Sequence, residues 1–203
     1  MIYFDIETAV ISWDDVPGAT QEQWRTFSKR YSDDESPELL WYDKAAFHAE
    51  FGRAVCISAA RDDGQVKSFS GSEGKLLEDW KNALERYPSA ALCAHNGNGF
   101  DIPFLCRRMT ILGIEIPPPL LDCQRKPWER KNVDTMEMWG FGEWKPRVKL
   151  DLLAHVLGVP SPKTDMDGSQ VGEAFREGRI DEIVRYCEQD VKCLREVYKK
   201  LTA

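Results

Sequence analysis

Hydrophobic positions along the chain recur with two periods, which separate the expected strands from the expected helices. Short apolar or alternating stretches predict β-strands over residues 2–8, 53–60, 65–70 and 90–94. Longer stretches repeat apolar residues every three or four positions, which predicts helices over 75–87, 101–112, 149–157 and 180–200, and a short helix after Ser169. The turn residues 62–64 join two strands into a hairpin. Because hairpin and strand–helix–strand patterns alternate, we expect an α/β fold with a mixed sheet flanked by helices.

Residues 12–50 interrupt this pattern and are interpreted as a helical insertion after the first strand. Helices are expected over 20–31 and 37–47, because Pro37 suits a first helical turn and Ser36 suits the capping position before it. The insertion is rich in aromatic residues: Trp13, Trp24, Phe27, Tyr31, Trp41, Tyr42 and Phe47. These rings either stack the bases of a nucleic acid or pack the insertion's own helices together, and we favour the second interpretation.

The composition is typical of a globular protein, and the length suits one domain. The chain has 203 residues, of which 42% are hydrophobic and 30% charged. No apolar run approaches the length of a membrane span, and the chain begins directly with a strand-like segment, so we expect a cytoplasmic protein without a signal peptide. The six cysteines include no pair with C-x-x-C spacing, so reduced thiols are expected rather than a zinc site.

The charge is unevenly distributed along the chain. The net charge of −7 argues against a simple basic nucleic-acid-binding protein. Residues 106–149, however, contain nine lysines and arginines against six acidic residues. This basic segment, which includes Arg125, Lys126, Arg130 and Lys131, either contacts a phosphate backbone or forms a solvated loop, and charge alone does not separate the two.

Two carboxylates interrupt the first apolar strand. Asp5 and Glu7 are two positions apart, so a strand places both on one face. Charges in a buried strand are costly unless they are paired or bind a metal, and adjacent carboxylates repel each other. A divalent cation that prefers oxygen ligands, Mg²⁺ or Mn²⁺, would resolve the conflict. The alternative is an edge strand whose polar face meets solvent.

Two further groups of residues carry candidate chemistry. Residues 95–105 place two asparagines and two glycines before Phe100 and Asp101, at the junction of a strand and a helix. Asp101 is there either a helix cap or a functional carboxylate. In the C-terminal helix, Tyr186 and Asp190 are four residues apart and share one face, which also fits a simple buried hydrogen bond.

Together these groups resemble the three motifs of the DEDD (DnaQ-like) 3′–5′ exonucleases, in the tyrosine subclass. The motifs are Asp5-Ile6-Glu7-Thr8, then Asn96 with three residues before Phe100-Asp101, then Tyr186 with three residues before Asp190. The histidine of the sister subclass would stand at position 185, where this chain has arginine. Within the superfamily the chain is most similar to relatives of the proofreading domain of family-B DNA polymerases, and the runs 149–153 and 163–171 look like further family features.

The resemblance extends over nearly the whole chain and implies one exonuclease domain of residues 1–203 with a ribonuclease-H-like fold and a central five-stranded mixed sheet. It also implies two divalent cations, Mg²⁺ or Mn²⁺, with Asp5 between them. Tyr186 would orient the attacking water, and Thr8 and Asn96 would contact the terminal nucleotide. The implied metal ligands are four carboxylates: Asp5, Glu7, Asp101 and Asp190.

The activity that the family implies is hydrolysis of single-stranded DNA from its 3′ end, with release of nucleoside 5′-monophosphates and a role in DNA repair. We therefore expect a nucleic-acid partner and no membrane. Two alternatives stay open. The first alternative is a 3′–5′ exoribonuclease that performs the same chemistry on RNA, because the contacts that distinguish RNA from DNA at the 2′-hydroxyl cannot be placed from the sequence. The other is a non-catalytic nucleic-acid-binding scaffold, against which the complete acidic set argues.

Overall fold

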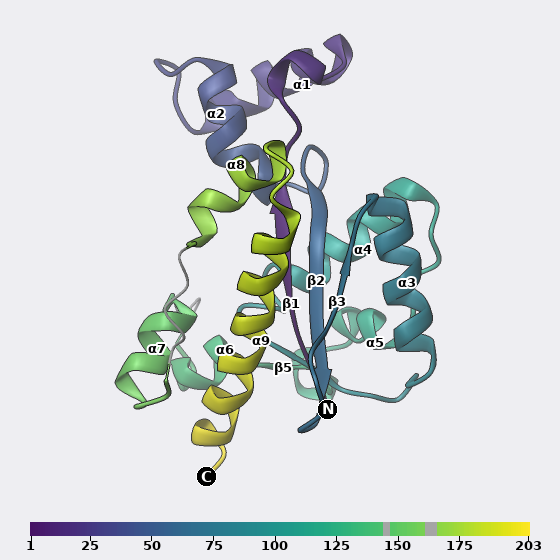
Figure 1. Ribbon diagram of the computed structural model, residues 1–203, viewed down its shortest axis with the longest axis vertical. Helices are drawn as coiled ribbons and strands as arrows, with labels where there is room; N and C mark the ends of the chain where they lie inside the picture. The colour runs from purple at the N-terminus through teal and green to yellow at the C-terminus, as the bar shows by residue number, and fades with distance from the viewer. Residues whose placement is uncertain (144–146, 161–165) are drawn as a thin grey trace.

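A five-stranded mixed sheet forms the centre of the computed structural model, which describes residues 1–143, 147–160 and 166–203 (Figure 1). The sheet order is β3-β2-β1-β4-β5, and the strands are β1 (Ile2–Ala9), β2 (Arg53–Arg61), β3 (Lys67–Ser70), β4 (Leu92–Ala94) and β5 (Val133–Asp134). Strand β2 is antiparallel to β1 and β3, whereas β4 is parallel to β1 and β5. The expected α/β fold with a five-stranded mixed sheet is confirmed.

Helices surround this sheet, and most of them begin and end within a few residues of the predicted ranges. They are α1 (Gly18–Phe27), α2 (Pro37–Lys44), α3 (Glu73–Glu85), α4 (Asp101–Leu112), α5 (Pro118–Leu121), α6 (Thr135–Gly140), α7 (Leu150–Val156), α8 (Val171–Arg176) and α9 (Ile180–Leu201). The sequence pattern predicts no helix between residues 112 and 149, but this part of the chain contains α5 and α6. The carboxylate of Asp134 accepts the backbone N–H groups of Met136 and Glu137 and so starts α6 directly after β5. Six residues are too few to show a helical period in the sequence.

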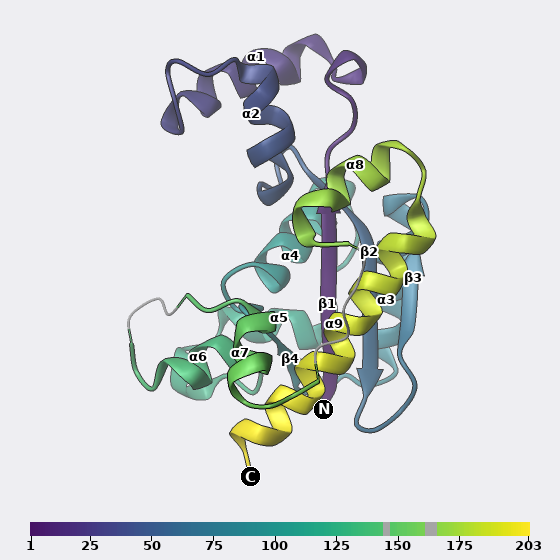
Figure 2. The same cartoon turned by 60° about the vertical axis from the view of Figure 1, so that its left-hand side comes forward.

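The alternation of side chains in β1 decides what each face of the sheet contacts. Phe4 points to one side, where it joins the largest hydrophobic cluster with Trp80 of α3 and Phe104 of α4. Tyr3 points to the other side and packs with residues of α9. Because every second residue shares a face, the carboxylates at positions 5 and 7 also point toward α9. Figure 2 shows α9 alongside β1.

The insertion between β1 and β2 folds around its own aromatic core. Trp24 and Trp41 are almost fully buried, and their rings meet edge-to-face with centroids 5.5 Å apart. Their indole N–H groups donate to the backbone oxygens of Pro37 and Ile11, at 2.7 and 2.9 Å. These two rings therefore pack the insertion's own helices, as favoured from the sequence, and present no face to a nucleic-acid base.

Two further expectations concern features outside the sheet. Along the residues that the structure describes, no helix combines the length and the apolar character that crossing a membrane requires. All six cysteines are free, and those at positions 56, 93, 187 and 193 are buried.

Candidate metal centre

The fold brings the three sequence motifs to one place, between β1, the start of α4 and the middle of α9. Asp5 and Glu7 project from β1, Asp101 is the first residue of α4, and Asp190 lies within α9. Burial raises the pKa of Asp5 well above its usual range, and the charges of the other three carboxylates raise it further. Four acidic side chains from separate parts of the chain thus lie within electrostatic reach of one another.

The two carboxylates of β1 form the most crowded part of this group. An oxygen of Asp5, an oxygen of Glu7 and the Sγ atom of Cys187 all lie within 4.8 Å of one another. The pKa of Glu7 is also well above its usual range, first because of burial and then because of the charge of Asp190. In the described part of the chain, no lysine or arginine forms an ion pair with any of the four carboxylates. Their mutual repulsion is therefore not offset by a cationic side chain.

The other two carboxylates also hold their protons more tightly than exposed ones. Burial raises the pKa of Asp101 to about 7, although its own backbone N–H and that of Ile6 donate to it. Burial raises the pKa of Asp190 to about 6, although a hydrogen bond from Tyr186 favours its charged form. Phe100 occupies the N-cap position of α4, so the interpretation of Asp101 as a helix cap is wrong.

Tyr186 is held between Asp190 and the loop before α8. Burial raises the pKa of its hydroxyl above the ordinary value of 10, and the neighbouring carboxylates raise it further, so the hydroxyl keeps its proton and donates to Asp190. A Cβ atom added at Gly168 would lie 3.6 Å from this hydroxyl oxygen. Part of the run 163–171 therefore lies against Tyr186, whereas residues 163–165 of that run are outside the described residues.

The glycines of the second motif are required by the protein's own packing. A Cβ atom at Gly97 would lie 2.4 Å from the Cβ of Ala94, and one at Gly99 would lie 2.5 Å from Oδ1 of Asn96. Asn96 has a φ of 62°, in the left-handed region that asparagine tolerates better than most residues. A tight turn with small residues therefore leads from β4 into the first turn of α4.

Two side chains support the site although the sequence did not single them out. The carboxylate of Asp134 accepts the backbone N–H groups of Asn96 and Asn98, at 2.9 and 3.0 Å, and so fixes the loop of the second motif. The thiol of Cys187 donates to a carboxylate oxygen of Asp5 at 3.5 Å, and burial raises its pKa, so it stays neutral. Cys187 belongs to the apolar stripe of α9, so its spacing in the sequence indicated core packing alone.

The residues expected to contact substrate, Thr8 and Asn96, stand directly after Glu7 and in the loop that leads into α4. Thr8 is half-buried and follows Glu7 at a point where the pairing of β1 with β2 becomes irregular. Asn96 is exposed. Phe47, at the end of the insertion, is 60% exposed, and its ring meets that of Phe100 edge-to-face with centroids 6.2 Å apart. The contacts of Thr8 and Asn96 to a nucleotide stay predictions.

The run 125–131 of the basic segment lies away from the carboxylates, whereas Lys149 acts near Tyr186. Hydrogen bonds from Ser169, and then the charge of Lys149, lower the pKa of Asp167, next to the glycine that lies against Tyr186. Asn132, directly after the run 125–131, accepts a hydrogen bond from the backbone of Leu92, the first residue of β4. This run therefore lies at the opposite end of β4 from the second motif. Arg108 forms a 2.6 Å ion pair with Glu73 and is 11% exposed, so it is not free to bind a phosphate. Lys145 lies outside the described residues.

Comparison with known proteins gives a family and two relatives. A DNA polymerase from Pyrococcus glycovorans is 22% identical over an alignment of 213 positions, gaps included, that covers 84% of this chain and 27% of that protein. The structure of the family B DNA polymerase from the hyperthermophilic archaeon Pyrobaculum calidifontis matches with a TM-score of 0.65 and 19% identity, over 99% of this chain and 24% of that one. The chain thus spans about a quarter of the length of each relative.

The family match covers most of the chain. Residues 44–201 match a family described as a predicted 3′–5′ exonuclease related to the exonuclease domain of PolB. The matched range contains Asp101, Tyr186 and Asp190 but not Asp5 and Glu7, which β1 places beside them in the fold. Since the match extends over far more than half of the sequence, the chain belongs to this family of predicted 3′–5′ exonucleases related to the exonuclease domain of PolB.

Proposed function

We propose that this chain is a metal-dependent exonuclease that removes nucleotides from the 3′ end of single-stranded DNA and releases nucleoside 5′-monophosphates. One observation carries the proposal: four carboxylates from three separate parts of the chain converge without a cationic side-chain partner among the described residues. Such a cluster costs folding free energy, which a purely structural role does not explain. The family supports the reaction class, and DNA repair is the process we propose for it.

The donor set suits two Mg²⁺ or Mn²⁺ ions. All four side chains offer hard oxygen ligands, and two divalent charges would balance the four negative ones. Asp5 is the central member, because the charges of the other three carboxylates all act on it, which fits a ligand shared by both ions. Bound cations would supply positive charge at the scissile phosphate and the leaving oxygen, and would make hydroxide available near neutral pH.

The chain's own residues position the reactants. Tyr186 retains its proton, so it is unsuited to act as a general base near neutral pH. We assign its hydroxyl to orienting the attacking water in line with the scissile bond, while Asp190 fixes that hydroxyl. Thr8 and Asn96 would contact the terminal nucleotide. The exposed ring of Phe47 would stack its base, because an aromatic face binds any base.

The direct test uses single-stranded DNA labelled at the 3′ or the 5′ end. With Mg²⁺ or Mn²⁺, the 3′ label should leave as a mononucleotide while the 5′-labelled strand shortens stepwise, and excess chelator should stop the reaction. Asp190→Asn should lower activity to background. Asp181→Asn, at an exposed position in the first turn of the same helix, should leave activity unchanged.

Each other outcome contradicts part of the proposal. Full activity in excess chelator, or in Asp190→Asn, would exclude the metal mechanism at these carboxylates. An RNA strand that is degraded faster than the DNA strand of the same sequence would identify an exoribonuclease. Tight binding of single strands without any cleavage, in either metal, would identify a non-catalytic scaffold.

A further inference from the structure

A pocket lies on the face of the sheet opposite the candidate metal centre. It has a volume of about 440 Å³, within the range of small-molecule sites, and is bordered by β2, β3 and α3. Lys67 and Phe69 of β3 line it, together with Ala59 of β2, which pairs with Lys67. Ser68, between those two β3 residues, points the other way and donates to Glu188 of α9. The pocket and the carboxylates are therefore separated by the sheet.

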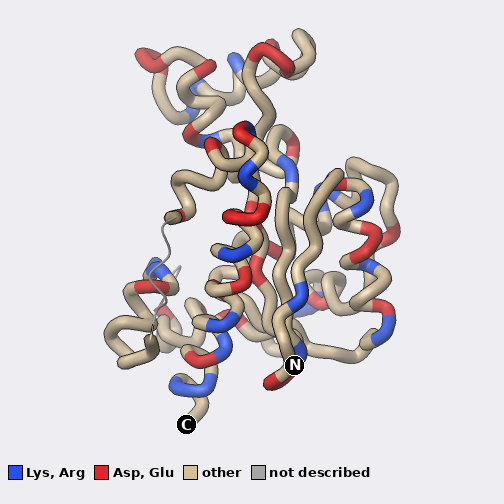
Figure 3. The backbone as a smooth tube through the Cα atoms, in the orientation of Figure 1, with Lys and Arg blue, Asp and Glu red and all other residues tan. Residues whose placement is uncertain are grey.

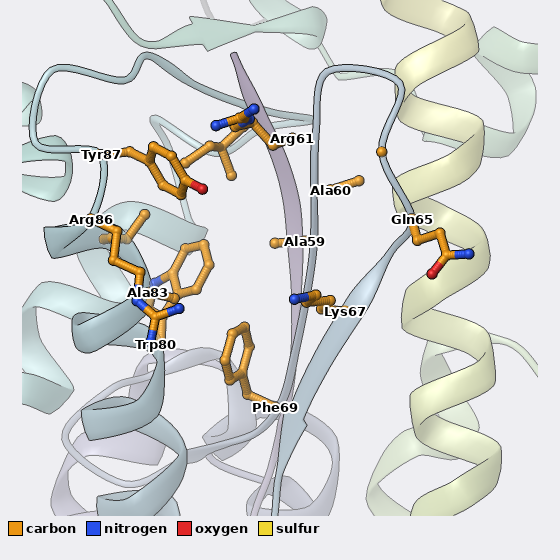
Figure 4. Close-up of a pocket in the computed structure, with 13 residues that line it drawn as sticks. Ala59, Ala60, Arg61, Gln65, Lys67, Phe69, Trp80, Ala83, Arg86 and Tyr87 are labelled. Carbon is orange, nitrogen blue, oxygen red and sulfur yellow. The ribbon is translucent and has the colours of Figure 1, made fainter.

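Three aromatic rings form much of the pocket's lining. Phe69 and Trp80 meet edge-to-face with centroids 5.6 Å apart, and Tyr87 stands at the end of α3 with 40% of its surface exposed. Figure 4 shows Tyr87 at one end of the pocket and Phe69 at the other. The indole N–H of Trp80 is buried and has no hydrogen-bond acceptor among the described residues. Trp80 itself is only 2% exposed, so Phe69 and Tyr87 provide the ring surface that a ligand can reach.

Three cations accompany these rings, and none of the described lining residues is acidic. The guanidinium of Arg61 lies 4.8 Å from the ring centroid of Tyr87, but it also pairs with Asp62 at 3.5 Å, which leaves Lys67 and Arg86 as the cations for a ligand. Lys67 and Arg86 stand on opposite walls in Figure 4, and neither takes part in an ion pair within the described part of the chain. Elsewhere acidic and basic positions are interspersed along the backbone (Figure 3), and the net charge is −7. A pocket lined by cations without acidic residues therefore selects for an anion.

We propose that this pocket binds a nucleoside 5′-monophosphate. The ligand must carry both a planar ring, for the aromatic lining, and a compact anion, for Lys67 and Arg86. A nucleotide combines the two at a size that fits the volume. The site rests on its own lining residues and does not depend on the nuclease reaction.

The test is a calorimetric titration of the full chain with AMP in the presence of a chelator. Without metal, the four carboxylates of the other face repel a phosphate, so binding there does not contribute. AMP should bind at least tenfold more tightly than either adenosine or inorganic phosphate, because each of these lacks half of the recognised chemistry. Asp101→Asn, in the candidate metal centre and outside the pocket lining, should bind AMP as the natural chain does. The indole N–H resonance of Trp80 should shift on addition of AMP.

Charge reversal locates the site. Lys67→Glu and Arg86→Glu should each weaken AMP binding tenfold or more. Lys200→Glu is the matched control for Arg86→Glu, since both positions lie at the C-terminal end of a helix, and it should not change the affinity. Thermal unfolding of each variant verifies that it is folded, and Tyr87→Ala provides a second variant without a charge change, which should also weaken binding.

Several results would overturn the proposal. The first two are a failure to bind AMP at millimolar concentration and an affinity for inorganic phosphate or adenosine equal to that for AMP. The other two are a loss of AMP affinity in Lys200→Glu equal to that in Arg86→Glu, and tighter binding of a trinucleotide than of AMP. The last result would identify a surface for a nucleic-acid strand instead of a mononucleotide site. No step of this test uses nuclease activity, so its failure would leave the proposed function unaffected. In the same way, an absence of nuclease activity would not contradict AMP binding in this pocket.

Discussion

Replacing Asp101 by asparagine should stabilise the metal-free protein at alkaline pH while it abolishes nuclease activity. The carboxyl group has a pKa of about 7 in the folded chain, chiefly because of burial, against an ordinary value of 3.8. Between these two pH values the folded state therefore binds a proton that the unfolded state does not. Stability from this group is complete below about pH 4 and is lost as the pH rises through 7. Asparagine has no such proton and keeps a side-chain oxygen that accepts hydrogen bonds.

The size of the effect follows from the pKa difference. One pKa unit corresponds to about 1.4 kcal/mol. Raising the pH from 5 to 8 therefore lowers the free energy of unfolding of the natural chain by about 3 kcal/mol relative to that of Asp101→Asn. For a chain of this length, the Tm of the natural chain should therefore fall by about 6–12 °C relative to the Tm of Asp101→Asn between pH 5 and pH 8. Burial lowers the pKa of both His48 and His95, so these histidines make the folded state less stable as the pH falls below about 6.5. Both proteins contain these histidines, so their contribution cancels in the comparison.

The assay is thermal unfolding of both proteins at several pH values in excess chelator, followed by the same series with Mg²⁺. Asp33→Asn, at an exposed position, serves as the control and should follow the natural chain throughout. Mg²⁺ should raise the Tm of the natural chain most at pH 8, where its ligands are ionised, and should raise that of Asp101→Asn less. A Tm difference between Asp101→Asn and the natural chain that stays constant from pH 5 to 8 would refute the reasoning.

Three further predictions concern the residues around the carboxylates. Tyr186→Phe should lower kcat by about 10²–10⁴-fold without changing metal affinity by calorimetry, since it removes one positioning hydroxyl; an unchanged rate would make the tyrosine a packing residue. Phe47→Ala should raise KM by about 5- to 150-fold, from a stacking contribution of about 1–3 kcal/mol per base, whereas Leu39→Ala, 64% exposed on the same insertion, should not. Reversing the charges of Lys126 and Lys131 should weaken the binding of long single strands and flatten its salt dependence, but leave a trinucleotide unaffected, because this run lies at the far end of β4. An unchanged salt slope would identify a solvated loop.

The sequence was sufficient for the sheet and for the acidic group because both depend on short-range patterns. Alternation in β1 predicted that Asp5 and Glu7 share a face, and helical spacing predicted the same for Tyr186 and Asp190. The interpretation of β1 as a solvated edge strand was wrong, since β1 is the central strand of the five. A carboxylate pair on a central strand faces another layer of the protein, which increases the cost of its charge and the need for a cation.

What the sequence did not provide depends on contacts between distant segments. Asp134 supports the second motif through hydrogen bonds to Asn96 and Asn98, from which it is separated by 38 and 36 positions in the sequence. No local pattern distinguishes this aspartate from an ordinary helix cap, a role that it also fills. The pocket behind β3 forms from a strand edge and a helix end whose cations look like ordinary surface charges in the sequence. The match with the exonuclease family begins at residue 44 and does not include β1, and the fold is what brings Asp5 and Glu7 next to the residues of the other two motifs.

The acidic group links the stability of this chain to its proposed chemistry. Burial is the largest cause of the raised pKa at all four carboxylates, and at Asp5 and Glu7 the charges of Asp101 and Asp190 raise it further. The surrounding core must therefore hold these groups in place against a local cost, which helices α4 and α9 do through their apolar faces on the sheet. A cation that binds only the folded, ionised state removes that cost and completes the site in the same step. Loss of the metal should therefore appear as lower stability at alkaline pH as well as loss of nuclease activity, and the two effects should be separable at Asp101, where asparagine relieves the first and not the second.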